Sequence, residues 1–305
     1  MSFSQRIKQE ISARRLSRPC CARAASYAAA CFGRYFDSRG VVVQTELEEA
    51  ARCIQRAYRM AGLGGSLTTK LRAGGTVYEF AVKDPQEVRR MLECFGHTGR
   101  EASLRINPQN LACGQCVSWF VAVAFLCSGT ATDPQKGYNL EFSTPRRNLA
   151  RDFEALLAEH EFAPRRTLRK GAGVVYVKAS EQVEDLLTFM GATSASLELM
   201  NSKIYKDIRN MTNRLTNCET ANMDKTAVAN AQTARAIRYL QQQGALEALP
   251  EPLRQAAALR MQYPEYSLAQ LAAAFQPPIS KSGLSHRLKK LEETARRLQE
   301  RKQNA

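Results

Sequence analysis

Residues 204–226 read IYKDIRNMTNRLTNCETANMDKT, and this stretch predicts a helix with two unlike faces. One face is an apolar stripe at helical spacing, made of Ile204, Ile208, Met211 and Leu215. The other face is polar and gathers Lys203, Lys206, Asn210, Asn213, Arg214 and Asn217. Asparagine is a poor helix former because its amide competes for nearby backbone groups. A polar face so rich in asparagine is therefore unusual for a helix that only meets water.

The chemistry of this polar face suits a nucleic acid. An asparagine amide both donates and accepts hydrogen bonds, which matches base edges and phosphodiester oxygens, while arginine and lysine supply the opposite charge. We therefore expect DNA contacts from Arg209, Asn210, Asn213, Arg214 and Asn217. We expect the apolar stripe to dock on the C-terminal helical domain. The alternative is a helix packed on a neighbour, with its amides satisfied inside the protein.

The overall charge favours a polyanionic partner. The 305 residues are enough for two domains, a hydrophobic content of 44% allows ordinary buried cores, and the formal net charge is +15. Residues 201–305 hold 17 Lys and Arg against 9 Asp and Glu, so the charge is densest in the last third. The longest apolar run, residues 117–127, is too short to span a bilayer, and no secretory signal is evident. We expect a cytoplasmic, nucleoid-associated protein that does not enter the membrane.

The cysteines predict reduced thiols. Nine cysteines are scattered along the chain, and an odd, scattered set is typical of a cytoplasmic protein. Cys113-Gly-Gln-Cys116 is the single CxxC motif in the sequence. With no second pair in sight, and with His97, His160 and His286 far apart, we expect neither a metal site nor a cofactor.

The C-terminal segment predicts a helix-turn-helix. Ser267 and Gln270 form a capping-box pattern before a short apolar helix, and Pro277-Pro278 ends that helix. Ser280 then opens a last helix with an inner leucine stripe. Its outer residues divide by chemistry into base-edge candidates (Ser282, Ser285, His286) and phosphate candidates (Lys281, Arg287, Lys289, Lys290). Ser280 is also expected to contact DNA, and the alternative for Ser280 and Ser282 is that both only cap the helix.

The first two thirds of the chain predict an internal duplication. Two helices rich in small residues lie within residues 20–40 and 116–128, and each opens the same α-β-α-β-β-α order. Matching positions include Thr45 with Thr144. Each copy carries a glycine-rich hairpin turn, at residues 73–75 and 171–173. The second copy is long enough for an additional two-strand hairpin after its first helix, whereas the first copy offers only VVVQ, residues 41–44.

Two long motifs carry a resemblance to a known family. RNMTNRLTNCETANMDKT, residues 209–226, and YSLAQLAAAFQPPISKSGLSHRLKKL, residues 266–291, resemble the DNA-binding region of the WhiA family, bacterial regulators of sporulation and cell division. The resemblance implies an α+β N-terminal domain with a duplicated unit like that of LAGLIDADG homing endonucleases, joined to an all-α helix-turn-helix domain. The expected boundaries are 1–191 for the LAGLIDADG-like domain, 192–223 for a linker and the Asn-rich helix, and 224–305 for the helix-turn-helix domain.

The resemblance also sharpens the question of enzymatic activity. A LAGLIDADG nuclease needs a carboxylate at the C-terminal end of each paired helix to hold its metal ions. The motif spacing puts those ends near Arg39 and Ser128, and neither residue is acidic. Asp37 and Asp133 lie close by but are expected to be turn and cap residues. We therefore expect no enzyme activity.

The expected function is a sequence-specific regulator of transcription that binds double-stranded DNA in sporulation or cell division. Two alternatives stay open, a metal-dependent LAGLIDADG-type endonuclease and a non-specific nucleoid-associated protein. The resemblance further implies a second regulator as partner of the N-terminal domain, a WhiB-type iron–sulphur protein.

Overall fold

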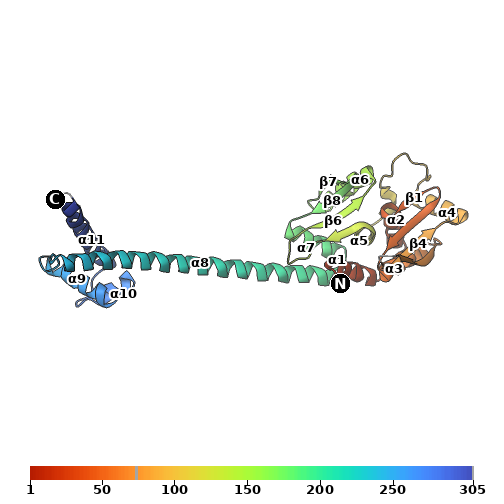
Figure 1. Ribbon diagram of the computed structural model, residues 1–305. Coiled ribbons are helices and arrows are strands. Elements are labelled where there is room, and N and C mark those ends of the chain that lie inside the picture. Colours follow the sequence, from red (N-terminus) through yellow and green to blue (C-terminus); the bar gives the residue numbers. More distant parts are fainter. Residues whose placement is uncertain (73–74, 304–305) are drawn as a thin grey trace. The chain divides into compact units, whose positions relative to one another are not determined.

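The computed structural model describes residues 1–72 and 75–303 and divides the chain into two compact units, Met1–Lys206 and Asp207–Ala305. The first unit contains helices and both sheets, whereas the second is entirely helical over its described residues (Figure 1). The expected fold class is therefore confirmed. The turn predicted at residues 73–75 includes residues 73 and 74, which lie outside the described residues.

The first unit repeats one set of elements twice. Its helices are α1 (Phe3–Ala13), α2 (Pro19–Phe32), α3 (Glu48–Met60), α4 (Pro85–Phe95), the 3-10 helix η1 (Pro108–Asn110), α5 (Gly114–Ser128), α6 (Arg147–Ala158) and α7 (Ser180–Phe189). Its strands are β1 (Tyr35–Asp37), β2 (Gly40–Thr45), β3 (Ser66–Arg72), β4 (Gly75–Val82), β5 (Gly129–Ala131), β6 (Leu140–Thr144), β7 (Arg165–Arg169) and β8 (Ala172–Val177). They form two antiparallel sheets with the orders β1-β2-β4-β3 and β5-β6-β8-β7. The identical strand order in both sheets confirms the duplication.

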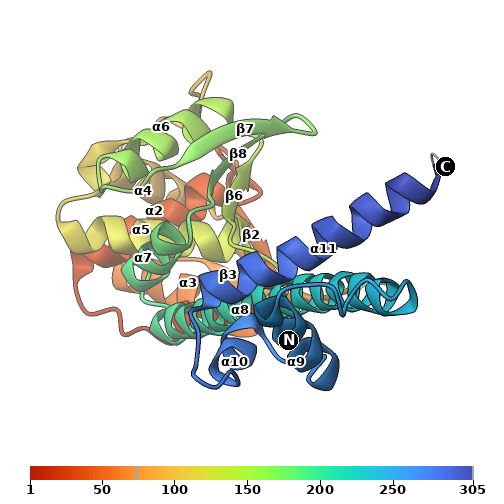
Figure 2. The same ribbon diagram turned by 90° about the vertical axis from the view of Figure 1, so that its left-hand side faces the viewer.

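The two small-residue helices α2 and α5 lie side by side at the centre of the first unit (Figure 2). Nearly every residue of both helices is buried, because alanine, serine and cysteine let the two backbones approach closely. Larger rings fill the space around the pair. Phe32 at the end of α2 packs edge-on against Phe120 of α5 and Phe153 of α6.

The first copy differs from the sequence prediction at the end of α2. The helix ends at Phe32 instead of continuing to Gly40, and residues 35–37 form β1, paired with β2 in the register Tyr35↔Val42. Gly33 permits the early end, because a Cβ there would lie 2.7 Å from the carbonyl oxygen of Ala29 and 2.8 Å from that of Val42. The first copy therefore has its own hairpin, and the expectation of only VVVQ was wrong.

The segment between the units is a single helix, α8 (Thr193–Gln242), which contributes residues to both. The structure shows no separate linker after residue 192 and no break at the expected boundary at residue 224, because α8 runs without interruption from Thr193 to Gln242. The sequence contains neither glycine nor proline between residues 192 and 243, so nothing interrupts the helix. Its end comes at Gly244, whose φ of +64° lies in the left-handed region that glycine adopts easily.

The second unit builds its own core from the C-terminal part of α8 and three further helices, α9 (Glu251–Gln262), α10 (Leu268–Ala273) and α11 (Lys281–Gln303). Ile237 and Leu240 of α8 share this core with Leu271 of α10 and Leu288 of α11. The unit therefore has the separate hydrophobic core of an independent domain. No helix among the described residues is long and apolar enough to cross a membrane.

Candidate nucleic-acid interface

Helices α10 and α11 form the predicted helix-turn-helix. The expected capping box starts α10, where the Ser267 hydroxyl accepts from the Gln270 backbone N–H at 3.3 Å and the Gln270 side chain accepts from the Ser267 N–H at 2.9 Å. In the turn, the Ile279 backbone N–H donates to the Ala272 carbonyl at 3.1 Å. Both helices are thus held against the same core, with the outer face of α11 left open.

The outer face of α11 collects most of the α11 residues that were predicted to contact DNA. Its inner residues Leu284, Leu288 and Leu291 are buried. The exposed residues are Lys281, Ser282, Ser285, His286, Lys289 and Lys290. Residues 281–291 contain no acidic side chain, so this part of the helix presents positive charge together with small polar groups.

Two predicted residues of this set also have structural roles. The Ser280 hydroxyl accepts from the Gly283 backbone N–H at 3.1 Å and lies 3.2 Å from the Ser282 hydroxyl, which is the capping arrangement considered as the alternative. Arg287 is half-buried, with its guanidinium over the Phe275 ring at 5.4 Å from the centroid. Ser280 therefore caps the start of α11, and Arg287 packs α11 against Phe275 in the turn that follows α10.

A groove beside α11 adds a lysine that the sequence reasoning missed. The groove has a volume of about 580 Å³ and lies between α8, the start of α10 and α11. Lys225 of α8 lines it together with Lys281, Ser285 and Lys289 of α11. Lys225 belongs to the motif at residues 209–226, but its position beside α11 depends on the tertiary packing of two helices far apart in sequence.

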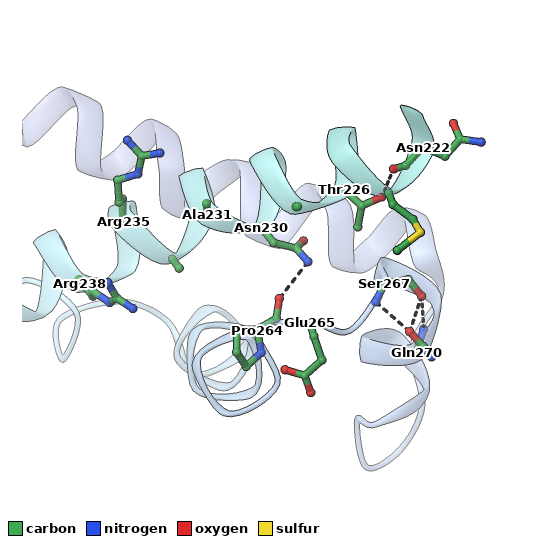
Figure 3. Close-up of a pocket in the computed structure, with 13 residues that line it drawn as sticks. Asn222, Thr226, Asn230, Ala231, Arg235, Arg238, Pro264, Glu265, Ser267 and Gln270 are labelled. Atoms are coloured by element: carbon green, nitrogen blue, oxygen red, sulfur yellow. Dashed lines mark hydrogen bonds between the residues drawn. The ribbon is translucent and has the colours of Figure 1, made fainter. Parts of the chain in front are cut away.

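A second, larger hollow lies on another side of α8, with a volume of about 880 Å³ (Figure 3). Arg235 and Arg238 are among its lining residues. The Asn230 amide, by contrast, donates to the Pro264 carbonyl at 3.0 Å, and the buried Arg260 donates to the Tyr266 carbonyl at 2.8 Å. Asn230 and Arg260 thus hold the loop between α9 and α10, so this asparagine of α8 is structural.

The predicted Asn-rich face of α8 is exposed from Arg209 to Asn217. Arg209, Asn210, Asn213, Arg214 and Asn217 are all exposed, and within residues 1–72 and 75–303 the structure gives their side chains no hydrogen-bond partner. These residues are thus available for an external ligand. These five residues precede the part of α8 that packs into the core of the second unit. The predicted α11 residues lie on a helix that packs on that core.

The expected docking of the apolar stripe was wrong. Ile208 is 57% exposed, Met211 73% and Leu215 59%, and Ile204 is exposed as well. The helical spacing correctly placed these residues on one face, but spacing alone does not show whether a face has a partner. Both faces of α8 are exposed to solvent around these residues. The first α8 residue that is buried in the core of the second unit, Ile237, comes much later in the helix.

The C-terminal end of α2 is bound by a cation from the protein itself. The Arg146 guanidinium donates to the Cys31 carbonyl at 2.7 Å and to the Gly33 carbonyl at 2.9 Å. Because α2 ends at Phe32, the expected location of its C-terminal end near Arg39 was wrong. The partner helix α5 ends at Ser128, as predicted, and the Ser128 hydroxyl donates to the Ala124 carbonyl at 3.0 Å.

The two nearby aspartates are turn residues, as predicted. Asp37 accepts from the Arg39 backbone N–H at 2.8 Å and forms an ion pair with its guanidinium, and these hydrogen bonds lower the pKa of the Asp37 carboxyl. Asp133 accepts from the Gln135 backbone N–H at 2.9 Å.

One group of side chains escaped the sequence reasoning altogether. The expectation of no metal site rested on there being a single cysteine pair, and that premise was wrong, because Cys20 and Cys21 lie beside Cys113 and Cys116. A signal was present in the sequence, since both pairs fall at the start of the matching helices of the duplication. An adjacent Cys-Cys pair does not have the CxxC spacing of common zinc motifs, so it was not recognised.

The fold and the site together define a class of protein in which a LAGLIDADG-like α+β domain precedes a helix-turn-helix domain. Two family descriptions match the chain, the WhiA LAGLIDADG-like domain over residues 117–209 and the WhiA C-terminal HTH domain over residues 212–295. The chain is 36% identical over 307 residues to the probable cell division protein WhiA of Desulforudis audaxviator, which covers 97% of each chain. This chain belongs to the WhiA family.

Two further comparisons agree. The probable cell division protein WhiA of Ruminiclostridium cellulolyticum is 32% identical over 315 residues, covering 99% of this chain and 100% of that protein. The crystal structure of full-length DUF199/WhiA from Thermatoga maritima matches with a TM-score of 0.62 at 20% identity, covering 97% of this chain and 99% of that one. This structural match shows the same fold.

Proposed function

We propose that this protein is a sequence-specific DNA-binding regulator of transcription that acts in cell division or sporulation and does not cleave DNA. The observation that carries the proposal is the outer face of α11, where Ser285 and His286 are exposed beside Lys289 and Lys290. A helix-turn-helix places such a face in the major groove, where polar side chains read base edges and lysines bind phosphates. The role in cell division is drawn from the names of the relatives.

The same proposal includes a supporting contact from α8. Asn210, Asn213, Arg214 and Asn217 recur at helical spacing on an exposed face, and Arg209 lies beside them. Arginine and asparagine suit phosphate oxygens as well as bases. This face would extend the contact beyond the segment covered by α11.

The absence of nuclease activity is supported by the ends of the paired helices. Phe32 and Ser128 stand where two carboxylates are required, and Arg146 binds the carbonyls at the end of α2. A guanidinium there repels a divalent cation and uses the oxygens that face it. We therefore assign the first unit a role other than catalysis.

A partner for the first unit remains part of the proposal. The family resemblance implies a second regulator, a WhiB-type iron–sulphur protein, bound to this unit in the cytoplasm near the nucleoid. This assignment is tested by asking whether the WhiB-type protein co-purifies with the first unit alone, residues 1–206. Binding that requires only residues 207–305 would contradict it.

The function is tested by selection followed by titration. The full chain is used to enrich duplexes from a random library, and its affinity is then measured for the enriched duplex and for a scrambled duplex of the same composition. A sequence-specific regulator should prefer the enriched duplex by at least about 10³-fold. Equal affinities would favour the non-specific nucleoid protein, and cutting of the duplex with magnesium or manganese would favour the endonuclease.

A further inference from the structure

Four cysteine side chains meet where α2 and α5 begin. Cys20 and Cys21 lie in the first turn of α2, Cys113 is the residue before α5, and Cys116 lies in its first turn. Their sulfur atoms all lie within 4.8 Å of one another. The individual Sγ–Sγ distances are 3.4 Å between Cys113 and Cys116, 3.9 Å between Cys116 and Cys21, and 4.0 Å between Cys21 and Cys113.

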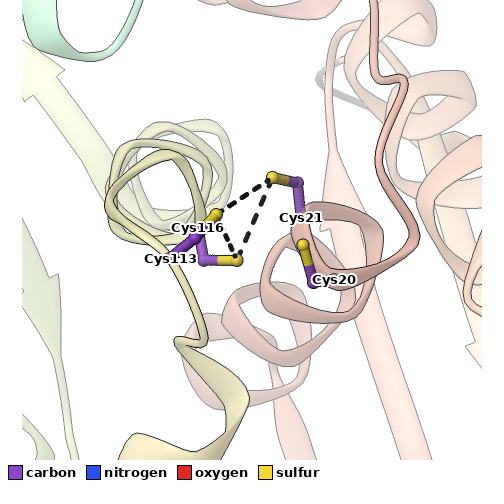
Figure 4. Close-up of side chains that lie close together, drawn as sticks. All are labelled: Cys20, Cys21, Cys113 and Cys116. Atoms are coloured by element: carbon purple, nitrogen blue, oxygen red, sulfur yellow. Dashed lines mark hydrogen bonds between the residues drawn. The ribbon is translucent and has the colours of Figure 1, made fainter.

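The four sulfur atoms face a common centre (Figure 4). Zinc binds thiolates at about 2.3 Å in a tetrahedron, whose edges are then about 3.8 Å long. The measured separations of 3.4, 3.9 and 4.0 Å are close to that edge. We propose that Cys20, Cys21, Cys113 and Cys116 bind one zinc ion in a closed, structural site.

The environment suits a site that carries negative charge. The N-terminal ends of α2 and α5 both reach the cluster, and neither has a side-chain cap on its backbone N–H groups. A helix N-terminus carries partial positive charge and stabilises thiolates. Four thiolates around one divalent ion leave a net charge of about −2, and the two helix ends offset part of it.

Two other uses of the cysteines fit the geometry less well. An iron–sulphur cluster places its thiolates on different iron atoms, so it needs a wider set than four sulfurs within 4.8 Å. A disulfide between Cys113 and Cys116 would leave the buried Cys21 without a role, although Cys21 lies about as close to both of them. One ion bound by all four sulfurs uses every member of the group.

The site would fasten the paired helices at their N-terminal ends. Arg146 binds the opposite, C-terminal end of α2 through the Cys31 and Gly33 carbonyls. The zinc ion would thus hold the N-terminal ends of α2 and α5, while the Arg146 guanidinium holds the C-terminal end of α2. In this arrangement the metal serves the stability of the first unit and takes no part in chemistry on DNA.

The experiment measures the metal content of the full chain, purified without chelators and under argon. We expect about one zinc and less than about 0.1 iron per chain by elemental analysis. The Cys20→Ser, Cys113→Ser double variant should hold less than about one tenth of that zinc. The matched control Cys94→Ser, Cys218→Ser changes two cysteines outside the cluster and should keep all of it.

A second measurement does not depend on how the variants fold. Wild-type protein is stripped of metal under reducing conditions and titrated with Co²⁺, which reports tetrahedral thiolate ligation by its charge-transfer and d–d absorption. We expect saturation at one Co²⁺ per chain, displacement by zinc, and a higher melting temperature with metal than without. A stoichiometric iron chromophore, a wild-type protein without zinc or a cobalt spectrum, or full zinc in the double variant would each overturn the proposal.

Discussion

The guanidinium of Arg146 donates a hydrogen bond to the carbonyl oxygen of Cys31 over 2.7 Å, and so joins the second copy of the duplicated unit to the first. The same nitrogen also reaches the carbonyl of Gly33 at 2.9 Å. The last carbonyls of a helix have no partner within it, and a cation there is favourable. The contact thus stabilises the C-terminal end of α2.

Replacing this arginine should destabilise the first unit. In Arg146→Ala the two carbonyls lose their donor, and we expect the free energy of unfolding to fall by about 1–3 kcal/mol. The neighbouring Arg147 is exposed, so Arg147→Ala is the matched control and should change it by less than about 0.5 kcal/mol. Chemical denaturation followed by circular dichroism measures both variants. If Arg146→Ala and Arg147→Ala had the same free energy of unfolding, the contact would contribute nothing to stability.

Two small polar residues of α11 should carry sequence discrimination. Ser285→Ala or His286→Ala should cost about 1–3 kcal/mol on the enriched duplex and little on a scrambled one, because base-edge contacts exist only on the correct sequence. Gln299→Ala, further along the exposed side of α11, is the control. Fluorescence anisotropy titrations on both duplexes give the two affinities. Equal losses on the two duplexes would reassign the residue to a backbone contact.

Lys289 should act through charge. Lys289→Ala removes one phosphate contact, so binding to the enriched and the scrambled duplex should weaken alike and the salt dependence should lose about one unit of slope. The measurement is a series of titrations at increasing salt. Arg301→Ala, in the last turn of α11, is the charge-matched control and should leave the slope unchanged. A loss confined to the enriched duplex would instead indicate base reading by Lys289.

The exposed face of α8 makes a separate prediction. The Asn213→Ala, Arg214→Ala double variant should lose about 2 kcal/mol of binding free energy, because amide and guanidinium contacts to DNA disappear. Its melting temperature should not fall, since neither side chain has a protein partner among the described residues and alanine is the better helix former. The control is Met211→Ala, Leu215→Ala on the apolar stripe. Unchanged affinity with a lowered melting temperature would make the Asn-rich face structural.

Local patterns in the sequence predicted much of this fold. The Ser267 capping box and the leucine stripe of α11 act over a few residues, so they could be found without the structure. The duplication was visible because both copies repeat the same order of elements. The end of α2 was misplaced because it depends on the approach of the Val42 carbonyl to Gly33 across the β1–β2 hairpin.

The residues of the candidate sites could be predicted only in part. The polar face of α11 follows from helical spacing, and most of it is exposed as expected. Lys225 and the pair Cys20 and Cys21 were missed, because their neighbours come from elements far away in the sequence. The exposure of Ile208 and its stripe was misjudged for the same reason, since amphipathic spacing defines a face without showing what covers it.

The central claim is that the second unit carries the recognition of DNA and that the first unit does not cut it. The most direct test compares residues 207–305 with residues 1–206 on the enriched duplex by anisotropy, in magnesium, with the DNA examined for cleavage afterwards. The account predicts that residues 207–305 retain the preference for the enriched duplex, that residues 1–206 bind it at least about 10²-fold more weakly, and that the DNA stays intact. Tighter binding or cleavage by residues 1–206 would contradict it.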